Sequence, residues 1–252
     1  MSRRLALTLA AGLVLAGIAL LYRDVLPNLV RQWAADEDYS HGFLIVPLAL
    51  YFAWERRSRL ATIPPRPAWS GLAVVAGSIG VLAAGTLGAE LFLARVSLLG
   101  VLAGLVVFLL GWAHLRVLAF PLAFLVLMIP LPAIVFNQIA FPLQLLASRL
   151  GAMTLAAAGI PVLREGNVIT LASTTLEVAE ACSGIRSLIS LLTLAIVYGY
   201  VAERRTSVRA ALAVASIPVA IVANAVRVAG TGFAAHLRGP EAAQGFLHAF
   251  SG

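Results

Sequence analysis

The 252-residue chain is 61% hydrophobic and only 12% charged, with a mean hydropathy of +0.97. Soluble domains carry about 25% charged residues, so the composition excludes an ordinary soluble protein and predicts an all-α polytopic membrane protein. The net charge of +7 comes from 18 arginines spread over short loops, which does not predict nucleic-acid binding. The single cysteine excludes an intramolecular disulfide.

Apolar runs predict about seven transmembrane helices in one integral-membrane domain that covers residues 1–252. The first run follows Ser2-Arg3-Arg4; it is longer than the roughly 7–15-residue core of a signal peptide and lacks a cleavage site, so we expect a retained span. Residues 23–41 and 229–252 are predicted as a polar loop and a polar tail. The expected spans are Leu5–Leu21, Phe43–Trp54, Trp69–Leu87, Ala94–Trp112, Val117–Ile134, Ser183–Ala202 and Ala210–Val228.

Residues 135–181 are the least regular part of the chain. The apolar stretch Phe136–Ala158 is interrupted by polar residues and Pro142, and we expect a re-entrant or interfacial helix there. Val162–Val178 is rich in β-branched residues that alternate in part, which predicts a short extended hairpin.

The arginines test this topology. With the N-terminus inside and residues 135–181 outside, the cytoplasmic segments hold ten arginines and two acidic residues, as the positive-inside rule requires. If residues 136–158 crossed the membrane, the basic loop 203–209 would fall outside, so seven spans are preferred. The ten cytoplasmic arginines are Arg3, Arg4, Arg56, Arg57, Arg59, Arg66, Arg116, Arg204, Arg205 and Arg209.

The one cysteine, Cys182, lies where a polar segment turns into a membrane helix. Backbone N–H groups and the helix dipole at such a position favour a thiolate, and Arg186 is one turn further on the same face. Cys182 is either a small packing residue or a reactive thiol. Glu180 and Arg186 are either supporting residues or ordinary charges near a helix start.

A cysteine nucleophile needs a base and a donor for the oxyanion. Asn224 and Arg227 share a helix face in an otherwise apolar span, where an arginine is costly and indicates function unless it extends to the interface. The outer histidines His41, His236 and His248 are all candidate bases, whereas His114 is predicted in a cytoplasmic loop. Scattered histidines and one cysteine predict no metal site, and we expect no cofactor.

Four motifs, in the right order, resemble those of the exosortase/archaeosortase family. They are Tyr39-Ser-His-Gly-Phe43, Glu180-Ala-Cys-Ser-Gly-Ile-Arg-Ser-Leu188, Pro218-Val-Ala-Ile-Val-Ala-Asn-Ala-Val-Arg-Val228 and Gly245-Phe-Leu-His-Ala-Phe-Ser-Gly252. The resemblance implies a catalytic set of Cys182, Arg227 and His248. We expect His41, Glu180, Arg186 and Asn224 to be substrate-binding or supporting residues. It also implies an eighth helix after Gly252, and hence a C-terminally truncated chain.

The resemblance further implies a bacterial inner-membrane cysteine protease or transpeptidase whose active site faces the periplasm. Its partners would be the lipid bilayer and exported proteins that end in a sorting signal of the PEP-CTERM type, with a short motif, a hydrophobic helix and a basic tail. Cys182 would form a thioester acyl-enzyme, with His248 as base and Arg227 at the oxyanion. Two alternatives are a transporter subunit that uses Asn224 and Arg227, and a scaffold of an export system.

Overall fold

The computed structural model describes residues 3–172, 174–178, 184–239 and 241. The chain forms two compact units, Met1–Pro132 and Ala133–Gly252. We describe each unit by itself.

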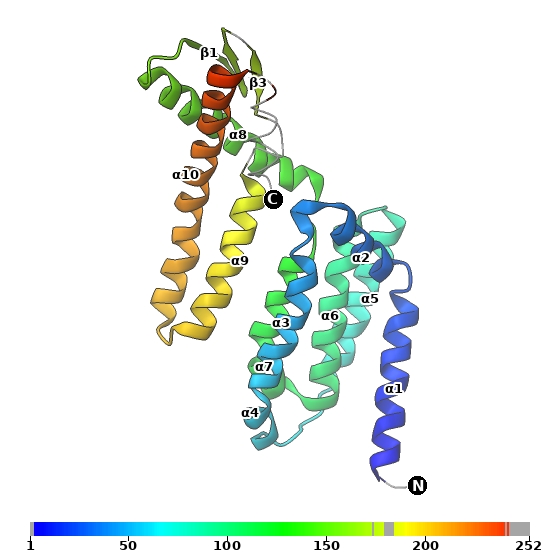
Figure 1. The fold of residues 1–252 in the computed structure, drawn as a ribbon. Coiled ribbons are helices and arrows are strands. Elements are labelled where there is room, and N and C mark those ends of the chain that lie inside the picture. The colour runs from blue at the N-terminus through cyan, green and yellow to red at the C-terminus, as the bar shows by residue number, and fades with distance from the viewer. Residues whose placement is uncertain (1–2, 173, 179–183, 240, 242–252) are drawn as a thin grey trace. The chain divides into compact units, whose positions relative to one another are not determined.

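The N-terminal unit is helical wherever it has regular structure (Figure 1). Helices α5 and α6 follow apolar runs that the sequence predicted as spans. The elements are α1 (Arg3–Leu21), α2 (Val25–Ala35), the 3-10 helix η1 (Glu37–Tyr39), α3 (Gly42–Glu55), α4 (Arg57–Thr62), α5 (Ser70–Leu87), α6 (Leu91–Leu110), α7 (Trp112–Phe124) and the 3-10 helix η2 (Leu125–Met128).

Helices α5 and α6 lie side by side because small residues let their backbones approach closely (Figure 1). A Cβ atom added at Gly71 would lie 2.2 Å from the backbone nitrogen of Phe108. One added at Gly85 would lie 2.6 Å from the backbone nitrogen of Ala94. A tight turn at Gly88-Ala89-Glu90 joins the two helices, with Ala89 at a φ of 52°.

Two predictions for the N-terminal unit are wrong. Residues 23–41 were expected as a loop, but they contain α2, which buries Leu29 and Trp33 one turn apart on one face. His114 was expected in a cytoplasmic loop, but it lies in the first turn of α7 and is buried. Both errors arise where polar residues interrupt a hydrophobic pattern that tertiary packing nevertheless completes.

In its described residues, the C-terminal unit combines three helices with a small antiparallel sheet in the order β1-β2-β3. Glu165 pairs with Val168 across a turn that includes Gly166, and Ile169 pairs with Leu176. The predicted extended hairpin is therefore confirmed and gains a third strand. The elements are α8 (Ala133–Ala157), β1 (Val162–Glu165), β2 (Val168–Leu171), β3 (Thr175–Glu177), α9 (Ile185–Ala202) and α10 (Thr206–Arg238).

The core of this unit joins α8, the sheet and the second half of α10, around Leu155, Ile169 and Val228. Figure 1 shows α8 lying obliquely across α10. Two glycines make the crossing close: a Cβ atom at Gly151 would lie 2.6 Å from Cγ1 of Val228, and one at Gly232 would lie 2.5 Å from Cδ1 of Leu155. Each glycine thus receives a large side chain from the opposite helix.

Helix α10 is longer than predicted. The sequence indicated a span that ends at Val228 and a polar tail from residue 229, but the helix continues to Arg238. Thr231 and Gly232 lower the hydropathy of this stretch, yet both are buried, as is Ala235 in the core. Packing against α8 and the sheet therefore stabilises the extra turns.

Five helices in the described residues are long and apolar enough to cross a membrane, namely α5, α6, α8, α9 and α10. The bent pair formed by Gly12–Leu21 and α2 would make a sixth. Helix α3, with 14 residues, and the stretch Trp112–Met128 are shorter. The all-α polytopic membrane class is thus confirmed, while the interfacial position of α8 stays a prediction.

Candidate functional site

The start of α9 is shaped by Gly184, which precedes the helix in the left-handed conformation with a φ of 78°. Its carbonyl accepts the backbone N–H of Leu188 at 2.8 Å. A Cβ atom at this position would lie 2.9 Å from both Cβ and Cγ of Asn224. Glycine is therefore required twice, for the backbone angle and for the close approach to α10.

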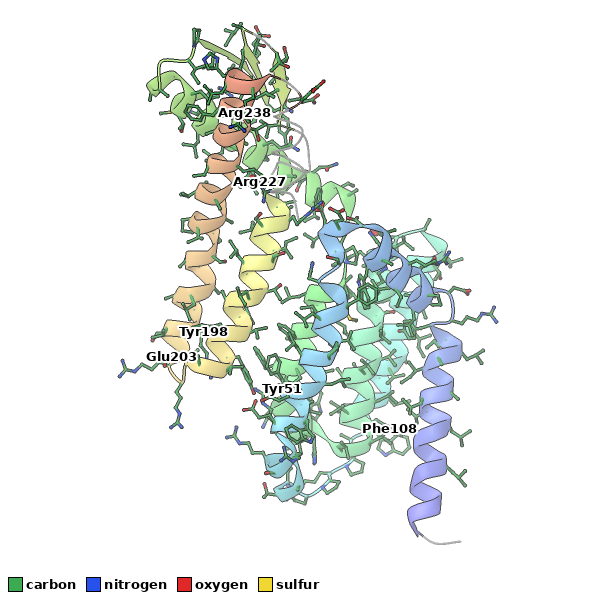
Figure 2. All side chains as sticks on the ribbon, viewed as in Figure 1. Tyr51, Phe108, Tyr198, Glu203, Arg227 and Arg238 are labelled. Atoms are coloured by element: carbon green, nitrogen blue, oxygen red, sulfur yellow. The ribbon has the colours of Figure 1, made fainter. Side chains whose placement is uncertain are left out.

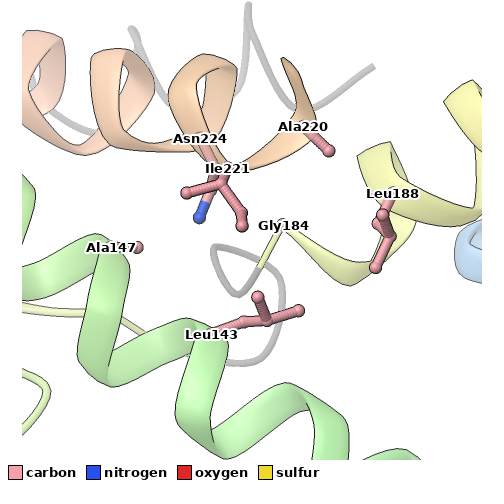
Figure 3. Close-up of a pocket in the computed structure, with 7 residues that line it drawn as sticks. All are labelled: Leu143, Ala147, Gly184, Leu188, Ala220, Ile221 and Asn224. Atoms are coloured by element: carbon pink, nitrogen blue, oxygen red, sulfur yellow. The ribbon is translucent and has the colours of Figure 1, made fainter. Parts of the chain in front are cut away.

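Asn224 comes from the middle of α10 and is 3% exposed. Figure 3 shows its side chain beside Gly184, at the edge of a cavity lined also by Leu143, Ala147 and Leu188. The cavity volume is about 10 Å³, close to the minimum for one water molecule. The amide of Asn224 thus provides a polar group in a confined and otherwise apolar space.

Arg227 lies one turn beyond Asn224 on α10 and is half-buried. Arg227 and Arg238 are both marked on the second half of this helix in Figure 2. No residue in the described part of the chain accepts a hydrogen bond from the guanidinium of Arg227. A partly desolvated guanidinium can hold a carboxylate, an oxyanion or a thiolate.

Helix lengths give the distance of this polar group from the turn between α9 and α10. At 1.5 Å per residue, α9 is about 27 Å long, close to the roughly 30 Å of a hydrocarbon core. On α10, Asn224 lies about 27 Å and Arg227 about 32 Å from Thr206. Gly184, Asn224 and Arg227 therefore all lie at one end of the α9–α10 pair, about one bilayer thickness from its turn.

The opposite end of the α9–α10 pair is basic. Arg209 donates to the carbonyls of Glu203 at 2.8 Å and Tyr200 at 3.2 Å. The carboxylate of Glu203 accepts the backbone N–H groups of Arg204 and Arg205. Figure 2 marks Glu203 at this turn, far from Arg227 along the helices. A basic turn of this kind favours the cytoplasmic side.

The chain before the site is anchored by the sheet. Val178 is buried, and its N–H donates to the carbonyl of Asn167 at 2.9 Å. The amide of Asn167 donates in return to the carbonyl of Val178 at 3.3 Å. Ser148 of α8 is fully buried and donates to the carbonyl of Gly166 at 2.9 Å. Helix α8 thus fixes the β1–β2 turn, which in turn fixes the end of β3.

In a comparison with known protein families, the model of the transmembrane exosortase family matches residues 33–252, which include most of the N-terminal unit and all of the C-terminal unit. The chain belongs to the transmembrane exosortase family. No curated protein and no solved structure matches the chain. Membership of this family implies a membrane-embedded sorting peptidase. The long apolar helices of this exosortase agree with a transmembrane protein.

Part of the predicted site of the exosortase lies within the described residues of one unit. Asn224, Arg227 and the first turn of α9, which carries Arg186, lie in the C-terminal unit. Cys182, Glu180 and His248 lie outside the described residues.

The two other outer histidines are described. His41 belongs to the N-terminal unit, where its Nε2 lies 3.1 Å from the carbonyl oxygen of Leu127. His236 is exposed in the last turn of α10. Nine residues separate it from Arg227, which corresponds to about 14 Å along the helix and half a turn around it. His236 therefore faces away from the side of α10 that carries Arg227.

Sequence reasoning missed the role of Gly184 and of α8. Gly184 was only one letter of a motif, although a glycine directly before a predicted helix is a signal for positive φ. Leu143 and Ala147 of α8 line the cavity, but nothing in their apolar sequence context distinguishes them from ordinary packing residues.

Proposed function

We propose that this exosortase is a thiol peptidase or transpeptidase that cleaves C-terminal sorting signals of exported proteins. The observation that carries the proposal is the contact of Gly184 with Asn224, one helical turn from Arg227. Cys182 is only two residues before Gly184 in the sequence. The family match covers the cysteine, arginine and histidine motifs together.

In the proposed reaction the Cys182 thiolate attacks the carbonyl carbon of the scissile peptide bond. The resulting oxyanion is stabilised by the guanidinium of Arg227. His248 first takes the proton of the Cys182 thiol and then passes it to the leaving amine, the C–N bond breaks, and a thioester joins the substrate to Cys182. An amine, a hydroxyl or water then attacks the thioester and releases the thiol.

We assign the reaction to the non-cytoplasmic face of a bacterial inner membrane. The support is the separation of the basic Glu203–Arg209 turn from the Asn224–Arg227 end of α10 by about one bilayer thickness. A substrate with a hydrophobic helix and a basic tail would insert in the same sense, with the tail held inside by its charge. The sorting motif would then meet Arg227 at the outer interface.

The test is co-expression of the full-length gene with a reporter protein that bears a candidate sorting signal. Cys182→Ala, Arg227→Ala and His248→Ala should each abolish C-terminal cleavage while the protein still inserts into the membrane. Arg238→Ala and His236→Ala are matched controls, because both residues are exposed in the last turn of α10, and cleavage should continue in both. Cleavage by the Cys182→Ala protein would refute the thioester mechanism.

A further inference from the structure

Arg95 is a buried cation in the N-terminal unit to which the proposed peptidase chemistry gives no role. It lies in the second turn of α6, a helix that is otherwise almost wholly apolar, and its side chain is 3% exposed. Its Nε atom has no hydrogen-bond partner among the residues that the structure describes. A buried guanidinium with an unsatisfied N–H is unfavourable, so Arg95 indicates a site that an anion completes.

The acidic groups near Arg95 are engaged elsewhere. Glu90, whose charge acts on Arg95, caps α6 by accepting the N–H of Phe92 at 3.1 Å. Asp36 caps η1 by accepting the N–H of Asp38 at 3.0 Å. Within the described part of the chain, no carboxylate forms an ion pair with Arg95. A ligand anion would therefore meet a guanidinium whose Nε–H is still available.

Tyr39 shows which part of the unit the charge of Arg95 influences. Burial and the carboxylates of Asp36 and Asp38 raise the pKa of Tyr39, whereas a backbone hydrogen bond at Leu131 and the charge of Arg95 oppose this rise. Arg95 thus acts on the loop end of the unit, where η1 meets the segment that follows η2.

An apolar cavity of about 380 Å³ lies in the same unit, a volume within the range of ligand sites. Its walls come from α2, α3, α6, α7 and η2 and include Leu29, Trp33, Ala49, Leu98 and Leu102. No polar side chain lines it apart from the indole of Trp33. Some wall residues, such as Leu50, are exposed on the outer side of the helices, so the cavity opens laterally.

The cavity and Arg95 share one face of α6. Arg95, Leu98 and Leu102 are spaced i, i+3 and i+7, and helical side chains lean toward the N-terminal end of their helix. The guanidinium therefore lies beyond the end of the cavity nearest the start of α6. Trp33 marks this end, because it lines the cavity and its indole N–H donates to the carbonyl of Met128 at 2.9 Å.

We propose that the N-terminal unit binds one anionic phospholipid, with its phosphate at Arg95 and an acyl chain in the apolar cavity. A buried guanidinium with an unsatisfied N–H, beyond one end of an almost wholly apolar cavity, matches an amphiphile with a negative head group. A transmembrane helix is about 10 Å in diameter and is too thick for this cavity, whereas an acyl chain is one methylene wide. The site is independent of Cys182.

The experiment titrates the purified full chain in detergent with phosphatidylglycerol or with phosphatidylcholine of identical acyl chains, and counts bound lipid by native mass spectrometry. We expect one phosphatidylglycerol to bind about tenfold more tightly, because it has a net negative charge, whereas the choline ammonium of phosphatidylcholine offsets the phosphate charge that Arg95 attracts. Arg95→Gln should remove this preference. Arg23→Gln, which removes an exposed arginine paired with Asp24 at 3.4 Å, is the matched control and should keep it.

Two further variants keep the test decisive if Arg95→Gln does not fold. Arg95→Lys keeps the charge and should keep the preference. Ala49→Phe fills the cavity from a buried wall position and should weaken binding of both lipids. The proposal is overturned if Ala49→Phe binds both lipids like the wild type, or if Arg95→Gln keeps the preference for phosphatidylglycerol. It is also overturned if Arg23→Gln loses this preference to the same extent as Arg95→Gln.

Discussion

Gly184→Ala tests how the start of α9 is held against α10. The new Cβ atom would be forced into the left-handed region, at a cost of about 1–2 kcal/mol. It would also lie 2.9 Å from Cβ and Cγ of Asn224 and 3.0 Å from its Nδ2, and overpacking of this kind costs about 1–3 kcal/mol. We therefore expect a loss of about 2–5 kcal/mol in the free energy of unfolding.

Gly159→Ala is the matched control. Gly159 also has a positive φ, of 81°, but an added Cβ atom there meets nothing within 4 Å. Its substitution should cost only the backbone term of about 1–2 kcal/mol. The measurement is unfolding of both purified variants by SDS titration in mixed micelles, together with cleavage of a sorting-signal reporter, which Gly184→Ala alone should impair.

A double-mutant cycle identifies the neighbour responsible. Three atoms of Asn224 crowd the Cβ atom introduced at position 184. Asn224→Ala removes two of them, Cγ and Nδ2, and leaves the Cβ atom of residue 224. The cost of Gly184→Ala should then fall by about 1 kcal/mol in the Asn224→Ala background. Equal costs for Gly184→Ala and Gly159→Ala, or a cost unaffected by Asn224→Ala, would show that the two segments do not pack as described.

Three other substitutions test the packing of each unit by the same unfolding measurement. Ser148→Ala should cost about 1 kcal/mol, because its hydroxyl donates to the carbonyl of Gly166; no loss would mean that this turn is not held by α8. Leu155→Ala should cost about 2–5 kcal/mol, since the side chain is fully buried in the C-terminal core. Tyr22→Phe should cost about 1 kcal/mol by removing the buried 2.9 Å hydrogen bond to Ser97, and an unchanged stability would contradict that contact.

Hydropathy predicted the long apolar helices well, because α5, α6 and α9 need only an uninterrupted apolar run. It failed where a helix is stabilised by its neighbours. Helix α2 contains Asn28 and Arg31 on its exposed side, and its membership of the fold depends on Trp33, whose indole N–H donates to Met128, 95 residues further along the chain. The end of α10 depends likewise on packing against α8, which local sequence does not reveal.

The candidate site divides in the same way. Asn224 and Arg227 could be paired from the sequence because their spacing within one helix sets their common face. The contact between Gly184 and Asn224 joins residues 40 positions apart, and only the packing of α9 on α10 brings them together. Arg95 could have been singled out from an apolar run alone, but its burial and its apolar neighbours required the fold.

Two glycines at the crossing of α8 and α10 set the one position in which these helices pack. Val228 fits opposite Gly151, and Leu155 fits opposite Gly232, so a slide of α8 along α10 would separate each large side chain from the glycine that makes room for it. Val228 directly follows Arg227 in the chain. The position of α8 along α10 is thereby coupled to the position of the Arg227 guanidinium. A change in bilayer thickness would have to move both together.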